Sequence, residues 1–189
     1  MIKRIILSIG HGGQPGEKFD PGAINALGET ENQQAKEICA LLAAKLIKAG
    51  VSVYVMPDFS YLKSINQVNA IYQPGDWAIE IHKDSFTKFN PETMRRRCGS
   101  YFFNKSAKGK TASEIMQRSF IESGAHKTSW SRADNLSRHG GLGWNTMTKP
   151  LAHILELGFM QDENDADDDE FYATAAFNAI MKVKNTLLN

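Results

Sequence analysis

Short runs of β-branched and aromatic residues alternate with longer segments of helical periodicity along almost the whole chain. The strand-like runs cover residues 3–9, 51–56, 77–81, 100–103 and 151–157. Apolar residues recur at helical spacing over 31–49, 60–72, 111–123 and 170–188. This alternation predicts an α/β fold with a mostly parallel, twisted sheet and helices on both faces. The chain has 189 residues with no internal repeat or linker, so a single domain over 1–189 is expected.

The charge balance and the cysteines exclude several classes of protein. A net charge of +1 provides no overall field for nucleic acid or an anionic membrane, so neither partner is expected. The local run Arg95–Arg97 is a solvated turn or a contact to an anionic polymer. Cys39 and Cys98 show no metal-site or disulfide spacing and are expected to be buried free thiols. The sequence contains no indication of the oligomeric state.

The first residues do not have the pattern of a secretory signal. A charged start and a short apolar run lead straight into Gly10-His11, with no small-residue cleavage site. No other stretch is long and apolar enough to span a bilayer, so no membrane insertion is expected. We therefore expect synthesis in the cytoplasm, with any action on an external substrate following release or export.

Four polar residues are expected to meet at one edge of the sheet. His11 follows the first strand, His82 follows the third, and Glu156 lies within the last strand, while Glu31 opens the first helix. Ligands of open parallel sheets bind beyond the carboxyl ends of the strands. Two imidazoles and one carboxylate suit a hydrolytic zinc ion that keeps a position open for water, and a further carboxylate can serve as general base. Glu156, between apolar neighbours, fits the role of base.

Several alternatives remain open on spacing alone. Glu29 could replace Glu31, and Glu80 could be a buried partner of His82 or a solvent-facing residue. The remaining histidines are expected to be structural: His126, His139 and His153. The same donor set would also accept cobalt or manganese. Residues 124–149 form the least regular segment, and we expect a loop over a substrate groove whose Trp130 and Trp144 contact glycan.

The order of the motifs resembles a known family. A His-Gly-Gly loop after the first strand is followed by an Asp-Pro-Gly-Ala segment, a Gly-x-x-Glu before the first helix, a strand ending in His, and a strand carrying Glu. These are residues 8–13, 20–23, 28–31, 78–82 and 150–159. The set resembles the zinc-dependent N-acetylmuramoyl-L-alanine amidases of the AmiC-like type, the amidase_3 family.

The resemblance implies specific roles for residues of this chain. It implies that His11, Glu31 (rather than Glu29) and His82 bind Zn²⁺ and that Glu156 is the general base. The implied substrate is peptidoglycan, cut at the amide between N-acetylmuramic acid and L-alanine.

Two positions depart from the family pattern. Asp84 stands in the Lys83-Asp84-Ser85 segment where the family usually has an Asn-Ala pair, and Asp162 replaces the Asn expected after Gly158-Phe159. Both are expected to border the substrate. Asp165 falls at the trailing Asp of the last motif.

The biological setting and the rival functions follow from the same features. A catalytic domain without an evident signal is typical of a phage or prophage endolysin that causes bacteriolysis. One alternative is a zinc carboxypeptidase acting within the stem peptide. Another is a non-catalytic module that binds an anion at the Gly10–Gly13 loop beside a helix N-terminus.

Overall fold

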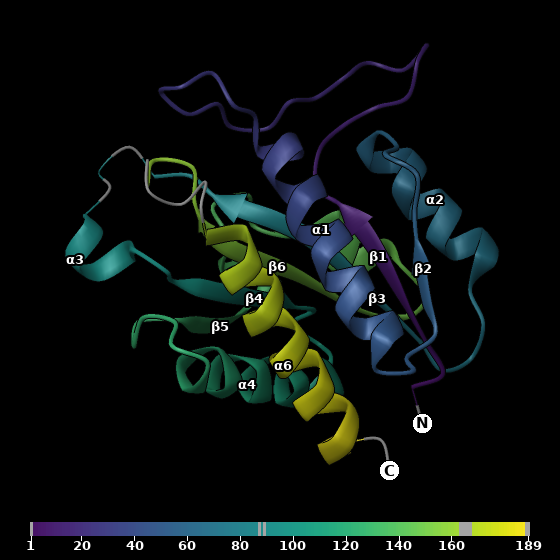
Figure 1. Cartoon of the computed structure of the whole chain (residues 1–189). Helices are drawn as coiled ribbons and strands as arrows, with labels where there is room; N and C mark the ends of the chain where they lie inside the picture. Colours follow the sequence, from purple (N-terminus) through teal and green to yellow (C-terminus); the bar gives the residue numbers. More distant parts are fainter. Residues whose placement is uncertain (1, 87, 89, 163–167, 188–189) are drawn as a thin grey trace.

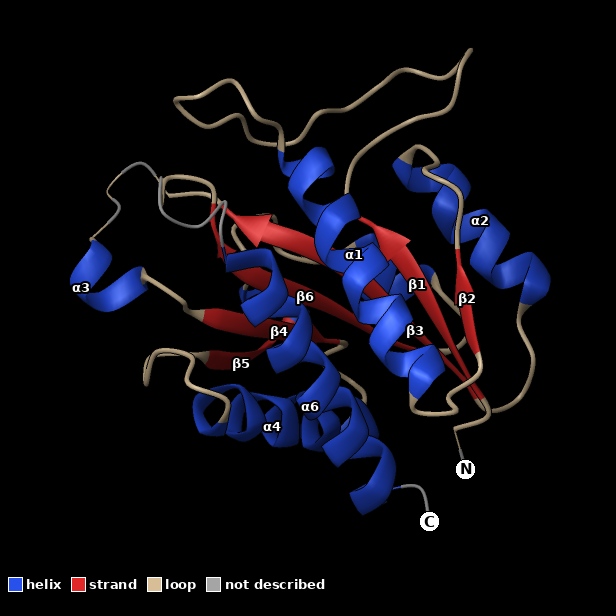
Figure 2. Ribbon diagram, in the orientation of Figure 1, coloured by secondary structure: helices blue, strands red, loops and turns tan. Residues whose placement is uncertain are grey.

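Six strands form one sheet in the order β2-β1-β3-β6-β4-β5 (Figures 1 and 2). The computed structural model describes residues 2–86, 88, 90–162 and 168–187. The strands are β1 (Arg4–Ile9), β2 (Val53–Val55), β3 (Asp76–Asp84), β4 (Cys98–Phe102), β5 (Trp130–Ala133) and β6 (Leu151–Phe159). All neighbouring pairs are parallel except β4 and β6, which are antiparallel. The predicted α/β fold with a mostly parallel sheet is confirmed.

Helices cover both faces of this sheet. One face packs against α1 (Glu31–Lys48), α4 (Ala107–Glu122) and α6 (Asp169–Leu187), of which α1 and α6 lie in front of the sheet in Figure 1. The other face packs against α2 (Tyr61–Ile71) and the short α5 (Gly143–Met147). The single-turn α3 (Pro91–Met94) leads into β4. Two apolar cores therefore enclose the strands.

Burial on both faces explains the continuous apolar run of β1. Ile5 and Leu7 belong to the core beneath α1 and α6, whereas Ile6 between them belongs to the core beneath α2. All three side chains are fully buried. A strand enclosed on both sides gains from apolar residues at every position, so the period-2 alternation of a half-exposed strand is absent.

The start of α1 is fixed by a capping box. The Thr30 hydroxyl accepts a hydrogen bond from the Gln33 amide at 3.2 Å, and the Thr30 amide donates to the Gln33 side chain at 3.0 Å. This arrangement satisfies two amides that the first helical turn leaves unpaired. It also fixes Glu31 in the first turn, at the edge of the sheet.

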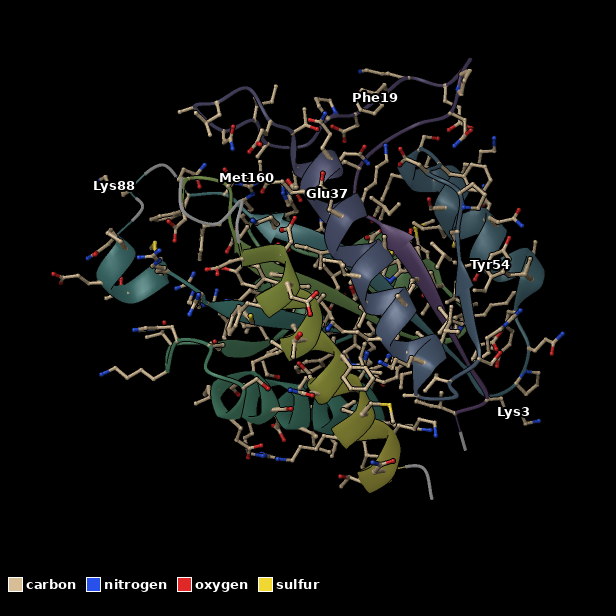
Figure 3. The ribbon with its side chains drawn as sticks, in the orientation of Figure 1. Lys3, Phe19, Glu37, Tyr54, Lys88 and Met160 are labelled. Carbon is tan, nitrogen blue, oxygen red and sulfur yellow. The ribbon has the colours of Figure 1, made fainter. Side chains whose placement is uncertain are left out.

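The carboxyl ends of β1, β3 and β6 meet at this same edge. Ile9 is paired with Ile81, and His82 is paired with Glu156. Residues 10–30 form a long loop beyond the ends of the strands (Figure 1). Figure 3 places Phe19 of this loop and Met160 after β6 at the end of the molecule opposite Lys3. The edge predicted to carry the site therefore lies at the end of the molecule that this loop and Met160 occupy.

The segment 124–149 differs from the prediction. It contains the edge strand β5, a 3-10 turn over Asp134–Leu136 and α5. Trp144 has no exposed surface and packs in the same core as Ile6 and Ile154, so its prediction as a glycan contact is wrong. Trp130 is 7% exposed. Trp144 is buried because it lies in α5, which packs against the face of the sheet.

Two further predictions concern the thiols and the membrane. Cys39 and Cys98 are buried thiols, as expected. Among the described residues, none of the helices is both long enough and apolar enough to cross a bilayer.

Candidate metal centre

Three side chains from separate elements bring their donor atoms together at the edge of the sheet. His11 comes from the loop after β1, Glu31 from the first turn of α1, and His82 from β3. Glu31 Oε1 lies 2.9 Å from His82 Nδ1 and 3.2 Å from His11 Nε2, and all three donors lie within 4.8 Å of one another. Tetrahedral ligands of a zinc ion lie about 3.3 Å apart. The spacing and the donor types therefore fit zinc.

Each imidazole has a second carboxylate behind it. Asp20 Oδ2 lies 2.9 Å from His11 Nδ1, and Glu80 Oε2 lies 3.1 Å from His82 Nε2. An imidazole whose far nitrogen donates to a carboxylate has its tautomer and ring orientation fixed for metal binding. The sequence left Glu80 as either a buried partner or a solvent-facing residue, and the structure shows it 2% exposed. Asp20 was not predicted to have this position.

Glycines allow the close approach of the loop to these rings. A Cβ on Gly10 would lie 2.4 Å from His82 Cε1, and one on Gly22 would lie 2.6 Å from His11 Cδ2. His11 itself has a φ of 63°, a conformation that costs energy for a residue other than glycine. Gly12 instead packs against Asp58. The sequence predicted that the glycines after His11 allow this close approach. In the structure Gly10 and Gly22 are the glycines that contact the two rings.

The electrostatics of the centre favour a positive charge between the three donors. Burial raises the pKa of Glu31, but hydrogen bonds from His11 and His82 outweigh it and hold the pKa far below its usual range. Burial lowers the pKa of His82, yet Glu31 and Glu80 outweigh it, so that its pKa lies well above 6.5. The pKa of His11 is raised in the same way, mainly by Glu31. A carboxylate surrounded in this way is prepared to bind a cation.

Glu156 lies beside the centre on the same face of the sheet as His82. The two residues are paired across β3 and β6, and Gly99 of β4 is the partner of Glu156 on its other side. Burial raises the pKa of Glu156 to about 8, with Asp84 and Glu31 raising it and His82 lowering it. A carboxyl group with a pKa near neutrality can both take up and release a proton. The structure thus brings together all four residues that the sequence placed at this edge.

The alternative candidates lie outside the centre. Glu29 Oε2 accepts hydrogen bonds from Asn25 at 2.8 Å and Gln34 at 2.9 Å, which leaves Glu31 as the carboxylate that faces the imidazoles. His153 is fully buried; its Nδ1 accepts from Trp77 Nε1 at 2.8 Å, and its Nε2 donates to a backbone carbonyl. It is structural, as expected.

The other two histidines also lie away from the candidate metal ligands. His126 contacts Thr128, and His139 contacts Arg138. Neither belongs to the donor cluster.

The predicted substrate-bordering residues have different surroundings. Asp84 ends β3, two residues after His82, and its Oδ2 lies 3.8 Å from Arg97. Asp162 is buried, with its Oδ2 3.7 Å from Arg95 Nε. Contact of either with substrate stays a prediction. Asp165 lies outside the described residues.

Comparisons with known proteins agree with this geometry. A family model described as N-acetylmuramoyl-L-alanine amidase (Amidase_3) matches residues 5–182. Similar solved structures include the N-acetylmuramoyl-L-alanine amidase from Clostridium difficile 630, with 17% identity, a TM-score of 0.78 and 97% of each chain covered. The CwlD amidase from Clostridioides difficile, in complex with the GerS lipoprotein, has 19% identity and a TM-score of 0.75, with 97% of this chain and 98% of that chain covered. AmiC2 of Nostoc punctiforme has 17% identity and a TM-score of 0.73, with 96% and 97% covered. No curated protein matches the sequence significantly.

Proposed function

Because the chain belongs to the Amidase_3 family of N-acetylmuramoyl-L-alanine amidases, we propose that it is a zinc-dependent enzyme of the cell wall. It hydrolyses the amide bond between N-acetylmuramic acid and L-alanine in peptidoglycan. The observation that carries this proposal is the convergence of His11, Glu31 and His82, with Glu156 beside them. The family match supports the reaction, and the donor set supports the cofactor.

His11, Glu31 and His82 would hold the zinc ion. When bound, zinc polarises a carbonyl oxygen and makes water more acidic. Asp20 and Glu80 keep the two imidazole rings oriented, so that one nitrogen of each faces Glu31. The three ligands carry a single negative charge, so the centre with zinc keeps a net positive charge that favours an oxyanion.

Glu156 would carry a proton from the attacking water to the leaving group. Its carboxylate takes the proton of the attacking water and delivers it to the nitrogen of the departing alanine. Burial raises the pKa of Glu156 to about 8, which suits the delivery step, while a cation beside it favours the ionised form needed to begin. The same side chain therefore serves both proton transfers, as base and then as acid.

The test of this assignment is Glu156→Gln. The amide keeps the shape of the side chain but cannot accept a proton, so we expect kcat on peptidoglycan to fall about 10²- to 10⁴-fold. Zinc content, measured by elemental analysis, should stay at the wild-type level because Glu156 is not a ligand. Glu114→Gln, on the outer side of α4, is the matched control and should keep full activity.

Two outcomes would contradict the assignment. Wild-type turnover by the Glu156→Gln protein would remove Glu156 from proton transfer. Loss of zinc from this variant would show that Glu156 helps to bind the metal instead.

A further inference from the structure

The face of the sheet that carries Glu156 continues across β4 and β5 to two arginines. Glu156 is paired with Gly99, Gly99 with Trp130, and Tyr101 with Arg132. Residues paired across strands, and those two apart within a strand, share a face. Arg97 directly precedes β4, at the end of the sheet where β6 finishes. A basic area therefore adjoins the acidic metal centre on the side away from His11.

Arg132 is held in place without being buried. Its guanidinium carbon lies 4.7 Å from the centre of the Trp130 ring, and that ring is 4.6 Å from the Tyr101 ring. Trp130 in turn lies against Gly99, where a Cβ would be only 2.2 Å from the indole. Stacking on an aromatic face orients a guanidinium while its N–H groups remain available. Arg132 is exposed, so its guanidinium group is accessible from solvent.

Arg97 is also oriented, and its hydrogen bonds are incomplete. Its guanidinium carbon lies 4.8 Å from the centre of the Phe159 ring, and its nearest carboxylate oxygen, on Asp84, is 3.8 Å away. Among the described residues, its buried Nε has no hydrogen-bond partner. Burial lowers the pKa of Arg97, Asp84 raises it and Arg132 lowers it, so the two guanidinium groups interact. A buried N–H group without an acceptor costs free energy, and a ligand that supplies the acceptor removes this cost.

The proton transfer assigned to Glu156 gives the point from which the substrate peptide extends. The departing alanine nitrogen must lie beside Glu156 to receive the proton, so the peptide continues from there. Tyr101 of β4 is paired with Arg132 of β5 on one side and with Ile154, two residues before Glu156, on the other, so its side chain shares the face of both residues. The path away from Glu156 across β4 therefore leads to Arg132.

The distance along this path suits a short peptide. With strands about 4.8 Å apart and a rise of about 3.3 Å per residue, the Cα atoms of Glu156 and Arg132 are about 12 Å apart. An extended peptide spans about 7 Å in two residues. The long side chain of Arg132 covers the remaining distance.

We propose that Arg132 and Arg97 form a carboxylate-binding subsite for the stem peptide, and that they recognise the α-carboxyl group of its second residue, which is free where that residue is linked onward through its side-chain carboxyl group. This inference rests on the proposed function, which places the peptide beside Glu156. Guanidinium groups bind carboxylates through paired, charge-assisted hydrogen bonds, which a carboxamide cannot match. The subsite makes the enzyme selective for stem peptides whose second residue is not amidated.

The test compares two synthetic muramoyl-pentapeptides that differ only at this group, which is a free carboxyl in one and a carboxamide in the other. We expect the wild type to cleave the acid with a kcat/KM about 10- to 100-fold higher than the amide. Arg132→Gln should remove most of this preference by lowering kcat/KM for the acid alone, and Arg97→Gln should act in the same direction. Arg118→Gln, on the exposed side of α4, should leave the preference unchanged.

Binding measurements separate this inference from the proposed function. Calorimetry with the Glu156→Gln protein should show tighter binding of the acid than of the amide, and the difference should vanish when Arg132→Gln is added. Equal binding and equal cleavage of the two peptides by the wild type would overturn the subsite but not the amidase. Carboxylate-dependent binding without any cleavage by the wild type would uphold the subsite and overturn the proposed reaction.

Discussion

The backbone at Gly10 limits where the His82 ring can lie. A Cβ at this position would be 2.4 Å from Cε1, 2.5 Å from Nδ1 and 2.6 Å from Nε2 of that ring, whereas ordinary contacts begin at 3.4 Å. Gly10 does not have a left-handed φ, so alanine is compatible with its backbone. Gly10→Ala therefore acts only through the contact between the new methyl group and the His82 ring. To reach an ordinary contact distance, the ring must move away by about 1 Å.

A displacement of this size breaks the geometry of the metal centre. His82 Nδ1 lies 2.9 Å from Glu31 and Nε2 lies 3.1 Å from Glu80, and the new Cβ would lie over the face of the ring, so a shift of about 1 Å moves both nitrogens out of line with these partners. Metal-ligand distances tolerate only about 0.2 Å. We expect Gly10→Ala to weaken zinc binding at least about 100-fold, which corresponds to roughly 3 kcal/mol.

The assay is zinc competition against a chromophoric chelator, with circular dichroism to verify the fold. Gly141→Ala is the matched control, because a Cβ there meets no atom within 4 Å and the backbone is not left-handed. It should bind zinc like the wild type. If a folded Gly10→Ala protein bound zinc within about threefold of the wild type, the position of His82 as a ligand would be refuted.

Two further predictions concern the outer carboxylates and the pH dependence of stability. Asp20→Asn and Glu80→Gln should each weaken zinc binding about 10- to 100-fold in the same competition assay, and wild-type affinity in both would contradict their role in orienting the rings. Burial lowers the pKa of His153 from 6.5 to about 4, so its neutral form stabilises the fold above pH 6.5 and this contribution is lost as the pH falls toward 4. Relative to His153→Gln, the wild type should lose about 2 kcal/mol of unfolding free energy between pH 7 and pH 5 in urea denaturation. An equal pH dependence of the two proteins would contradict a neutral, buried His153.

Much of the fold follows from the sequence because the strands are buried on both faces. Runs such as Ile5–Leu7 can only be satisfied inside a sheet covered by helices. The edge strand β5 was missed because only Trp130 of its four residues is buried, Arg132 is exposed, and the strand shows no apolar run. Trp144 was misassigned because nothing local shows that the five-residue α5 packs against the sheet.

The candidate site was predicted as far as parallel topology determines it. His11, His82 and Glu156 each lie at the carboxyl end of a parallel strand, so their convergence follows from the order of the elements. The period of the strand could also have identified Glu80, which shares a face with His82 two residues away. Asp20 could not be predicted, because it reaches His11 only through the fold of the long loop, in which Gly12 pairs with Asp20. The motif resemblance to the amidase family is confirmed by the family match.

The central claim is a metal-dependent cut at one amide bond. Its most direct test is mass spectrometry of purified peptidoglycan digested by the protein, with and without a zinc chelator. We expect free stem peptides that begin with an alanine amine, which disappear with the chelator and return when zinc is added. Muramoyl-peptides that stay intact, or cuts within the stem peptide, would contradict the account.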